Sequence, residues 1–154
     1  MALASPSSSI PPEVAGVPFL SASDAARELT VLARRFAAAF EWFASRATVG
    51  PSELRVRFAT ASRVLGEHAQ TFAALVPESA LLALARADGA AAELAPHASS
   101  GAVLESLHRA ITEISGLATP IADGALVRAV GSALVDVTDL RLAVASLEER
   151  FGAV

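Results

Sequence analysis

The sequence contains no cysteine, lysine, asparagine or tyrosine, and only 5% of its 154 residues are aromatic. Without cysteine the chain can form no disulfide, no thiolate nucleophile and no zinc–thiolate site. No window of 18 or more residues is free of charges and turn signals, so no membrane span is expected. The net charge of −4 gives no electrostatic basis for binding nucleic acid. These absences lead us to expect a cytoplasmic protein with neither nucleic acid nor membrane as a partner.

Catalytic motifs of the common kinds are also missing. The chain has no phosphate-binding glycine loop, no G-x-S-x-G and no H-E-x-x-H. Conventional hydrolase, kinase and zinc-protease functions therefore have no support in the sequence.

Hydrophobic residues make up 53% of the chain, and alanine supplies much of that fraction. Small apolar side chains with few aromatics favour closely packed helices over sheets. The first 21 residues are rich in Ser and Pro and read as a flexible leader, and residues 22–151 read as a single helical domain. Long helices are predicted over about 25–47, after a cap at Ser21 or Ser23, and over 51–76, 101–119 and 124–151, with a shorter one over 78–89.

Apolar residues recur in these segments at alternating steps of three and four, which is typical of buried helix faces. The predicted buried positions are Leu29, Leu32, Phe36, Phe40 and Phe43 in the first segment, Leu54, Phe58, Ala61, Leu65, His68, Phe72 and Leu75 in the second, and Leu126, Val130, Ala133, Val137, Leu140, Val144, Leu147 and Phe151 in the last. No strand-like alternation of useful length is present. The pattern predicts an all-α fold: an antiparallel up-down four-helix bundle with one additional short helix.

Such a bundle can hold a di-iron or di-manganese centre, which needs inward-pointing Glu residues and Glu-x-x-His motifs. The candidates for metal ligands are Glu67, His68, Glu105 and His108, and only the last two form a true E-x-x-H. At about 100° per residue, Glu105 points away from the apolar face of its helix and His108 lies at the edge of that face. Glu41 falls on an outer face as well. We therefore expect no complete two-metal site.

Three residues are candidates for lining a binding pocket: His68, Glu67 and Arg141. His68 occupies a buried position one turn from Leu65 and should be hydrogen-bonded to a Ser, a Thr or an acid on a facing helix, or else serve as an acid/base or metal ligand. Glu67 is rotated about 100° away and flanks that position. Arg141 lies beside the apolar face of the last helix, and either sends its guanidinium to the surface or meets a carboxylate or an anionic ligand.

The stretches "GEHAQTFAALVPE" (66–78) and "TPIADGALVRAVGSALVD" (119–136) resemble small, Ala-rich ferritin-like helical-bundle proteins of actinobacteria, most of them uncharacterised. The resemblance spans roughly residues 22–150 and rests on pattern and helix order. It implies a ferritin-like fold. In that superfamily E-x-x-H motifs bind a di-metal centre, whereas Gln70 stands here where the ligand His would fall, and the last helix has no such motif.

Three functions remain open at this point. The leading one is a small-molecule-binding or accessory protein without a complete di-iron site, with His68 lining any internal pocket. The first alternative is a metal-dependent oxygenase or hydroxylase of a specialised pathway. The second is a structural protein that forms a homo-oligomer, most simply a dimer, because a mean hydropathy of +0.50 is high for a small monomer.

Overall fold

A computed structural model of the chain describes residues 22–76, 99–118 and 124–152. These residues form four α-helices and no strand. The helices are α1 (Ala22–Arg46), α2 (Ser52–Leu75), α4 (Ser100–Leu117) and α5 (Gly124–Phe151). The predicted all-α class is thus confirmed. The leader predicted over 1–21 and the short helix predicted over 78–89 lie outside the described residues.

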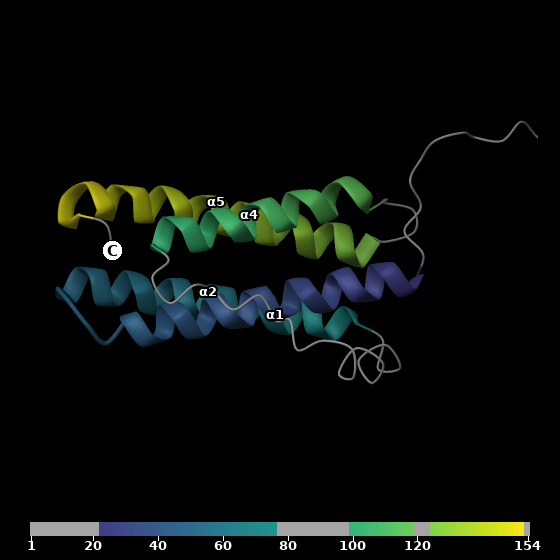
Figure 1. Cartoon of the computed structure of the whole chain (residues 1–154), viewed down its shortest axis with the longest axis horizontal. Helices are drawn as coiled ribbons and strands as arrows, with labels where there is room; N and C mark the ends of the chain where they lie inside the picture. Colours follow the sequence, from purple (N-terminus) through teal and green to yellow (C-terminus); the bar gives the residue numbers. More distant parts are fainter. Residues whose placement is uncertain (1–21, 77–98, 119–123, 153–154) are drawn as a thin grey trace, which may run out of the picture.

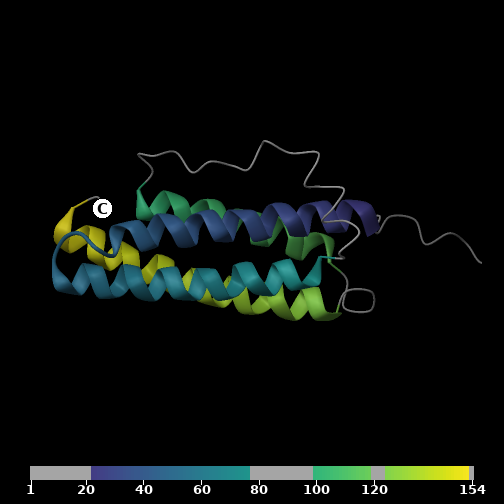
Figure 2. The same ribbon diagram turned by 90° about the horizontal axis from the view of Figure 1, so that it is seen from below.

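The four helices lie side by side with their long axes along the molecule. Figure 1 shows α1 and α2 in one layer and α4 and α5 in the other. In Figure 2 the view from below shows α1 beside α4 and α2 beside α5. Direct packing joins α1 to α2, α4 to α5, α2 to α5 and α1 to α4, so each helix touches two others around a shared core. No helix in this part of the chain is long and apolar enough to cross a membrane.

Local sequence signals set the beginnings of α2 and α4. Gly50 adopts a positive φ of 92°, which a residue with a side chain rarely adopts, and Pro51 immediately precedes α2. Ser99 caps α4, because its hydroxyl accepts a hydrogen bond from the backbone N–H of Ala102 at 3.2 Å. The carboxylate of Glu148, from α5, accepts two more bonds at this end, from the Ser100 hydroxyl at 3.0 Å and the Gly101 N–H at 3.2 Å.

Contacts between helices fix which ends lie together. Glu53, in the first turn of α2, forms an ion pair with Arg150, in the last turn of α5. The same end of α5 also meets the beginning of α4 through Glu148 and Ser100. The beginnings of α2 and α4 therefore both lie at the end of α5. The end of α2 lies at the opposite end of the molecule from the start of α4 (Figure 1).

The core runs along the whole length of the helices. Its fully buried large side chains are Leu32, Phe36, Phe43, Phe58, Leu65, Phe72, Val103, Leu104, Leu107, Ile111 and Val137. Most of the predicted buried positions are confirmed, but two aromatic residues are not. Phe40 is 40% exposed and Phe151 is 42% exposed. At 3.6 residues per turn the buried face of α1 passes through Ala39, which is fully buried, and leaves Phe40 about 100° away on an outer face. Phe151 is the last residue of its helix.

Candidate functional site

His68 is a buried polar residue that lies among aromatic side chains of the core. It projects from α2 and is only 7% exposed. The ring of Phe36, from α1, meets the imidazole edge-on with 5.6 Å between centroids, and Phe72 lies 6.4 Å away. The predicted burial of His68 is confirmed.

Asp136 of α5 is the partner of this histidine. The distance between His68 Nε2 and Asp136 Oδ2 is 2.8 Å. In its ionised form a carboxylate only accepts, which places a hydrogen on Nε2. The side chain of Asp136 is 44% exposed, so the hydrogen bond leads from the core toward solvent. Of the partners considered for His68, an acid on a facing helix is thus the one observed.

Glu67, Glu105 and Arg141 lie at or near the surface, and each forms an ion pair. Glu67 is exposed and accepts a hydrogen bond from Arg63, one turn earlier on α2. Arg141 of α5 pairs with Glu105 of α4, whose side chain is 50% exposed. Arg141 therefore meets a carboxylate, and that carboxylate lies at the surface.

Three of the four candidate metal ligands are engaged by other side chains. His68 is engaged by Asp136, while Glu67 and Glu105 are each paired with an arginine. His108 is partly exposed on α4. Within residues 22–76, 99–118 and 124–152 no three His, Cys, Asp or Glu side chains are grouped so that they could hold a metal ion.

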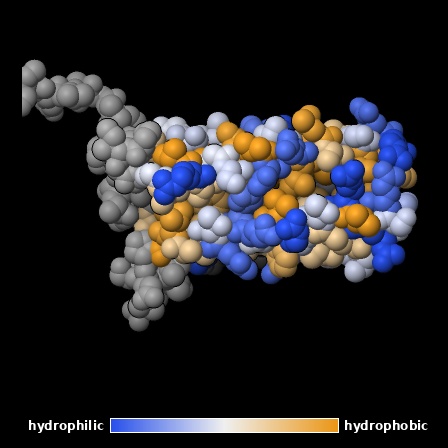
Figure 3. Space-filling view, turned by 180° about the vertical axis from the view of Figure 1, so that it is seen from behind, coloured by the Kyte–Doolittle hydropathy of each residue, from blue (hydrophilic) through white to orange (hydrophobic). Residues whose placement is uncertain are grey.

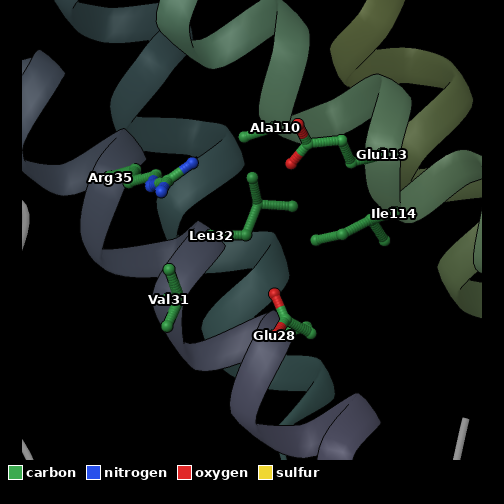
Figure 4. Close-up of a pocket in the computed structure, with 7 residues that line it drawn as sticks. All are labelled: Glu28, Val31, Leu32, Arg35, Ala110, Glu113 and Ile114. Atoms are coloured by element: carbon green, nitrogen blue, oxygen red, sulfur yellow. The ribbon is translucent and has the colours of Figure 1, made fainter.

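A small cavity opens between α1 and α4, with charged groups around an apolar floor (Figure 4). Its volume is about 50 Å³, which is room for one or two water molecules or the head of a small ligand. Arg35 of α1 and Glu113 of α4 project toward each other across it. The carboxylate of Glu28 approaches from the other side of Leu32 and Ile114.

One N–H group of Arg35, which is itself partly exposed, lacks the acceptor that a buried donor normally has. Its Nε is buried and has no hydrogen-bond partner in the described part of the chain. Nor does an ion pair join Arg35 to Glu28 or Glu113, although both carboxylates line the same cavity. A buried donor without an acceptor costs about 1–3 kcal/mol. The cavity therefore offers one positive and two negative groups to an occupant.

Periodicity did not single out Arg35 and Glu113 as functional residues. Each occupies an ordinary helix position, and their common cavity depends on how α1 lies against α4. Asp136 was missed for a similar reason, since its approach to His68 depends on the register of α2 against α5. No local sequence pattern predicts these side-chain contacts, because they depend on how the helices pack in the fold.

No protein-family model, curated protein or solved structure matches the chain.

Proposed function

We propose that the protein is a ferritin-like helical bundle without a complete di-iron site that acts as a small-molecule-binding or accessory protein. Its ligand site is the cavity between α1 and α4 rather than a pocket around His68. The cytoplasmic location expected from the composition belongs to the same proposal.

The contacts at the helix ends support the ferritin-like part of this proposal. The beginnings of α2 and α4 both lie at the end of α5, whereas the end of α2 lies at the opposite end of the molecule from the beginning of α4 (Figure 1). In a sequential up-down bundle, the end of each helix lies beside the beginning of the next one, whereas ferritin-like folds place the end of the second helix and the beginning of the third at opposite ends of the bundle. The helix ends therefore favour ferritin-like connectivity.

The observation that carries the ligand site is the unsatisfied Nε of Arg35. Buried donors in folded proteins are nearly always satisfied, so an acceptor atom is expected beside this one. Glu28 and Glu113, which line the same cavity, favour a positive group there. The chemical class that satisfies both requirements is a small zwitterion, in which a carboxylate meets Arg35 and an ammonium group lies between the two glutamates.

Thermal unfolding with three small probes tests this assignment. Glycine carries both charges, acetate carries only the negative one and methylammonium only the positive one. A ligand at ten times its dissociation constant stabilises a protein by about 1.4 kcal/mol, or about 3 °C in Tm for a chain of this size. We expect glycine to raise Tm by that amount and each single-charge probe to raise it less.

Arg35→Met is the informative variant, because it removes the donor and keeps the apolar stem. Glycine also stabilises proteins by exclusion from their surface, so the measured quantity is the difference in Tm shift between the wild type and Arg35→Met. Arg109→Met, which changes an exposed arginine of α4, is the matched control and should respond like the wild type. Equal shifts in wild type and Arg35→Met would show that the cavity does not bind the probe.

A further inference from the structure

The outer face formed by α1 and α2 carries an open groove between the two helices. Its volume is about 490 Å³ and its lining is mostly alanine. The lining residues are Thr30, Ala33, Arg34 and Ala37 of α1 and Ala69, Gln70, Ala73 and Val76 of α2. We call this surface the alanine groove. It lies on another side of α1 from the cavity of Arg35.

Phe40 lies beside the alanine groove, one turn along α1 from Ala37. It is 40% exposed, and its ring rests on Gly66 of α2, where an added Cβ would come within 3.0 Å of the ring. The Ser62 hydroxyl donates a 3.1 Å hydrogen bond to the Phe40 carbonyl and ties the two helices together here. An aromatic ring of this size is thus held at the surface, next to a depression that it does not fill.

Two opposite charges border this surface along α1. Arg34 lines the alanine groove, and Glu41 is exposed two turns further on, on the same side of the helix. Neither has an ion-pair or hydrogen-bond partner among the described residues. Seven residues correspond to about 10 Å along a helix, which is too far for Arg34 and Glu41 of one chain to meet.

We propose that a second copy of this chain docks on the α1–α2 face through a two-fold axis that sets the two α1 helices antiparallel. Symmetric pairing about a point between Ala37 and Ala38 brings Arg34 opposite the partner's Glu41, and Glu41 opposite the partner's Arg34. The same register lays each exposed Phe40 ring over the partner's alanine groove, at the turn between Ala33 and Ala37. A single two-fold axis therefore forms two Arg34–Glu41 ion pairs between the copies and covers the Phe40 ring of each copy.

The surface is self-complementary, as an isologous dimer interface must be. Alanine side chains allow the two α1 helices to approach closely, while Phe40 supplies the aromatic anchor typical of interface centres. This inference is independent of the proposed ligand site. The chain can be monomeric while the α1–α4 cavity still binds its probe, and it can form the dimer while that cavity binds nothing.

Sedimentation equilibrium of the full chain with charge-reversed variants tests the interface. Arg34→Glu and Glu41→Arg each replace two attractive pairs across the axis by two like-charge pairs. We expect each single variant to raise the dimer dissociation constant at least about tenfold. The double variant restores opposite charges at both positions and should return the constant to within about threefold of the wild type.

Arg109→Glu makes the same charge change on exposed α4 and should leave the dissociation constant unchanged. Circular dichroism of every variant verifies that the helices are intact, which is expected because neither Arg34 nor Glu41 has a described partner to lose. A wild-type chain that remains monomeric at about 1 mM overturns the proposal. A dimer whose constant is the same in wild type and Arg34→Glu overturns it too, because another surface then makes the contact.

Discussion

At the scale of single residues, His68 combines a buried ring with a hydrogen bond that points outward. Its imidazole lies against Phe36 and Phe72, while its partner Asp136 reaches solvent. Removing Asp136 and removing His68 should therefore have different effects on the stability of the fold. A buried imidazole without an acceptor keeps an unsatisfied N–H, whereas a half-exposed carboxylate without a donor is solvated by water.

This asymmetry predicts that Asp136→Ala destabilises the protein more than His68→Leu, by about 1 kcal/mol. The leucine of His68→Leu would pack with the neighbouring Phe rings and leave Asp136 to water. Urea unfolding followed by circular dichroism gives both free energies of unfolding. Asp139→Ala, at an exposed acid of the same helix, is the control and should change stability by less than about 0.5 kcal/mol. A larger loss in His68→Leu would mean that the imidazole contributes more than its hydrogen bond to Asp136.

The burial of His68 could be predicted because its position follows from spacing within one helix. Its partner could not, because that spacing says nothing about the rotation and register of α5 against α2. Phe40 shows the limit within one helix. Phe40 directly follows Ala39, and hydrophobicity alone favoured Phe40 as the buried residue, whereas the geometry of α1 buries Ala39.

At the scale of whole elements, the last turns of α5 hold the beginnings of two other helices. Glu148 accepts hydrogen bonds from Ser100 and Gly101 at the start of α4. Arg150 binds Glu53 at the start of α2 with two hydrogen bonds of 2.7 and 2.9 Å, in a side-by-side arrangement of guanidinium and carboxylate. An acid near the N-terminus of α2 and a base near the C-terminus of α5 also suit the helix dipoles.

The hydrogen bond from Arg150 lowers the pKa of Glu53 below its ordinary value of 4.5. A carboxyl group with a lowered folded-state pKa stabilises the fold above its unfolded pKa, and that contribution is lost as the pH falls through the folded value. We therefore expect Glu53→Gln to lose less stability than the wild type when the pH is lowered from about 5 to about 3. The measurement is urea unfolding across this range.

Glu149→Gln, at an exposed acid one residue before Arg150, serves as the comparison and should follow the pH dependence of the wild type. Identical acid profiles for the wild type and Glu53→Gln would show that the pair contributes nothing to stability in solution.

The elements themselves could be read from the sequence to within a few residues, apart from the segments outside the described residues. Pro51, Gly50 and the three-to-four spacing of apolar residues are local signals, and each acts within one helix. The ion pairs between helices could not be predicted in the same way. That Glu53 would meet Arg150, or Glu105 meet Arg141, depends on the order and direction of the helices in space, which no local pattern records.

At the scale of the whole molecule, the residues that could have formed a metal centre are distributed over separate contacts. His68 faces Asp136 between α2 and α5, Glu105 faces Arg141 between α5 and α4, and Glu67 turns outward on α2. His68, Glu67 and Glu105 are thus each engaged by a side chain outside the set of candidate ligands. A di-iron centre needs the reverse, with Glu and His from all four helices pointing inward together.

We therefore expect iron, manganese and zinc each to be present at well below one ion per chain in protein purified without chelator. Elemental analysis by mass spectrometry gives these ratios directly. His108→Ala and His68→Leu should leave the values at the same low level. One or more ions per chain, lost in either variant, would instead support the metal-dependent oxygenase or hydroxylase.

Trp42 has a use that follows from its place in the fold. It is the single tryptophan of a chain without tyrosine, is 7% exposed, and packs edge-on against Phe43 and Phe58 in the α1–α2 half of the core. The guanidinium of Arg46 lies 3.6 Å above its ring. Its fluorescence is therefore an intrinsic optical reporter of one helical hairpin, while the far-ultraviolet signal reports on all helices. Recorded on the same sample, the two signals show whether the packing around Trp42 is lost before the helices unfold.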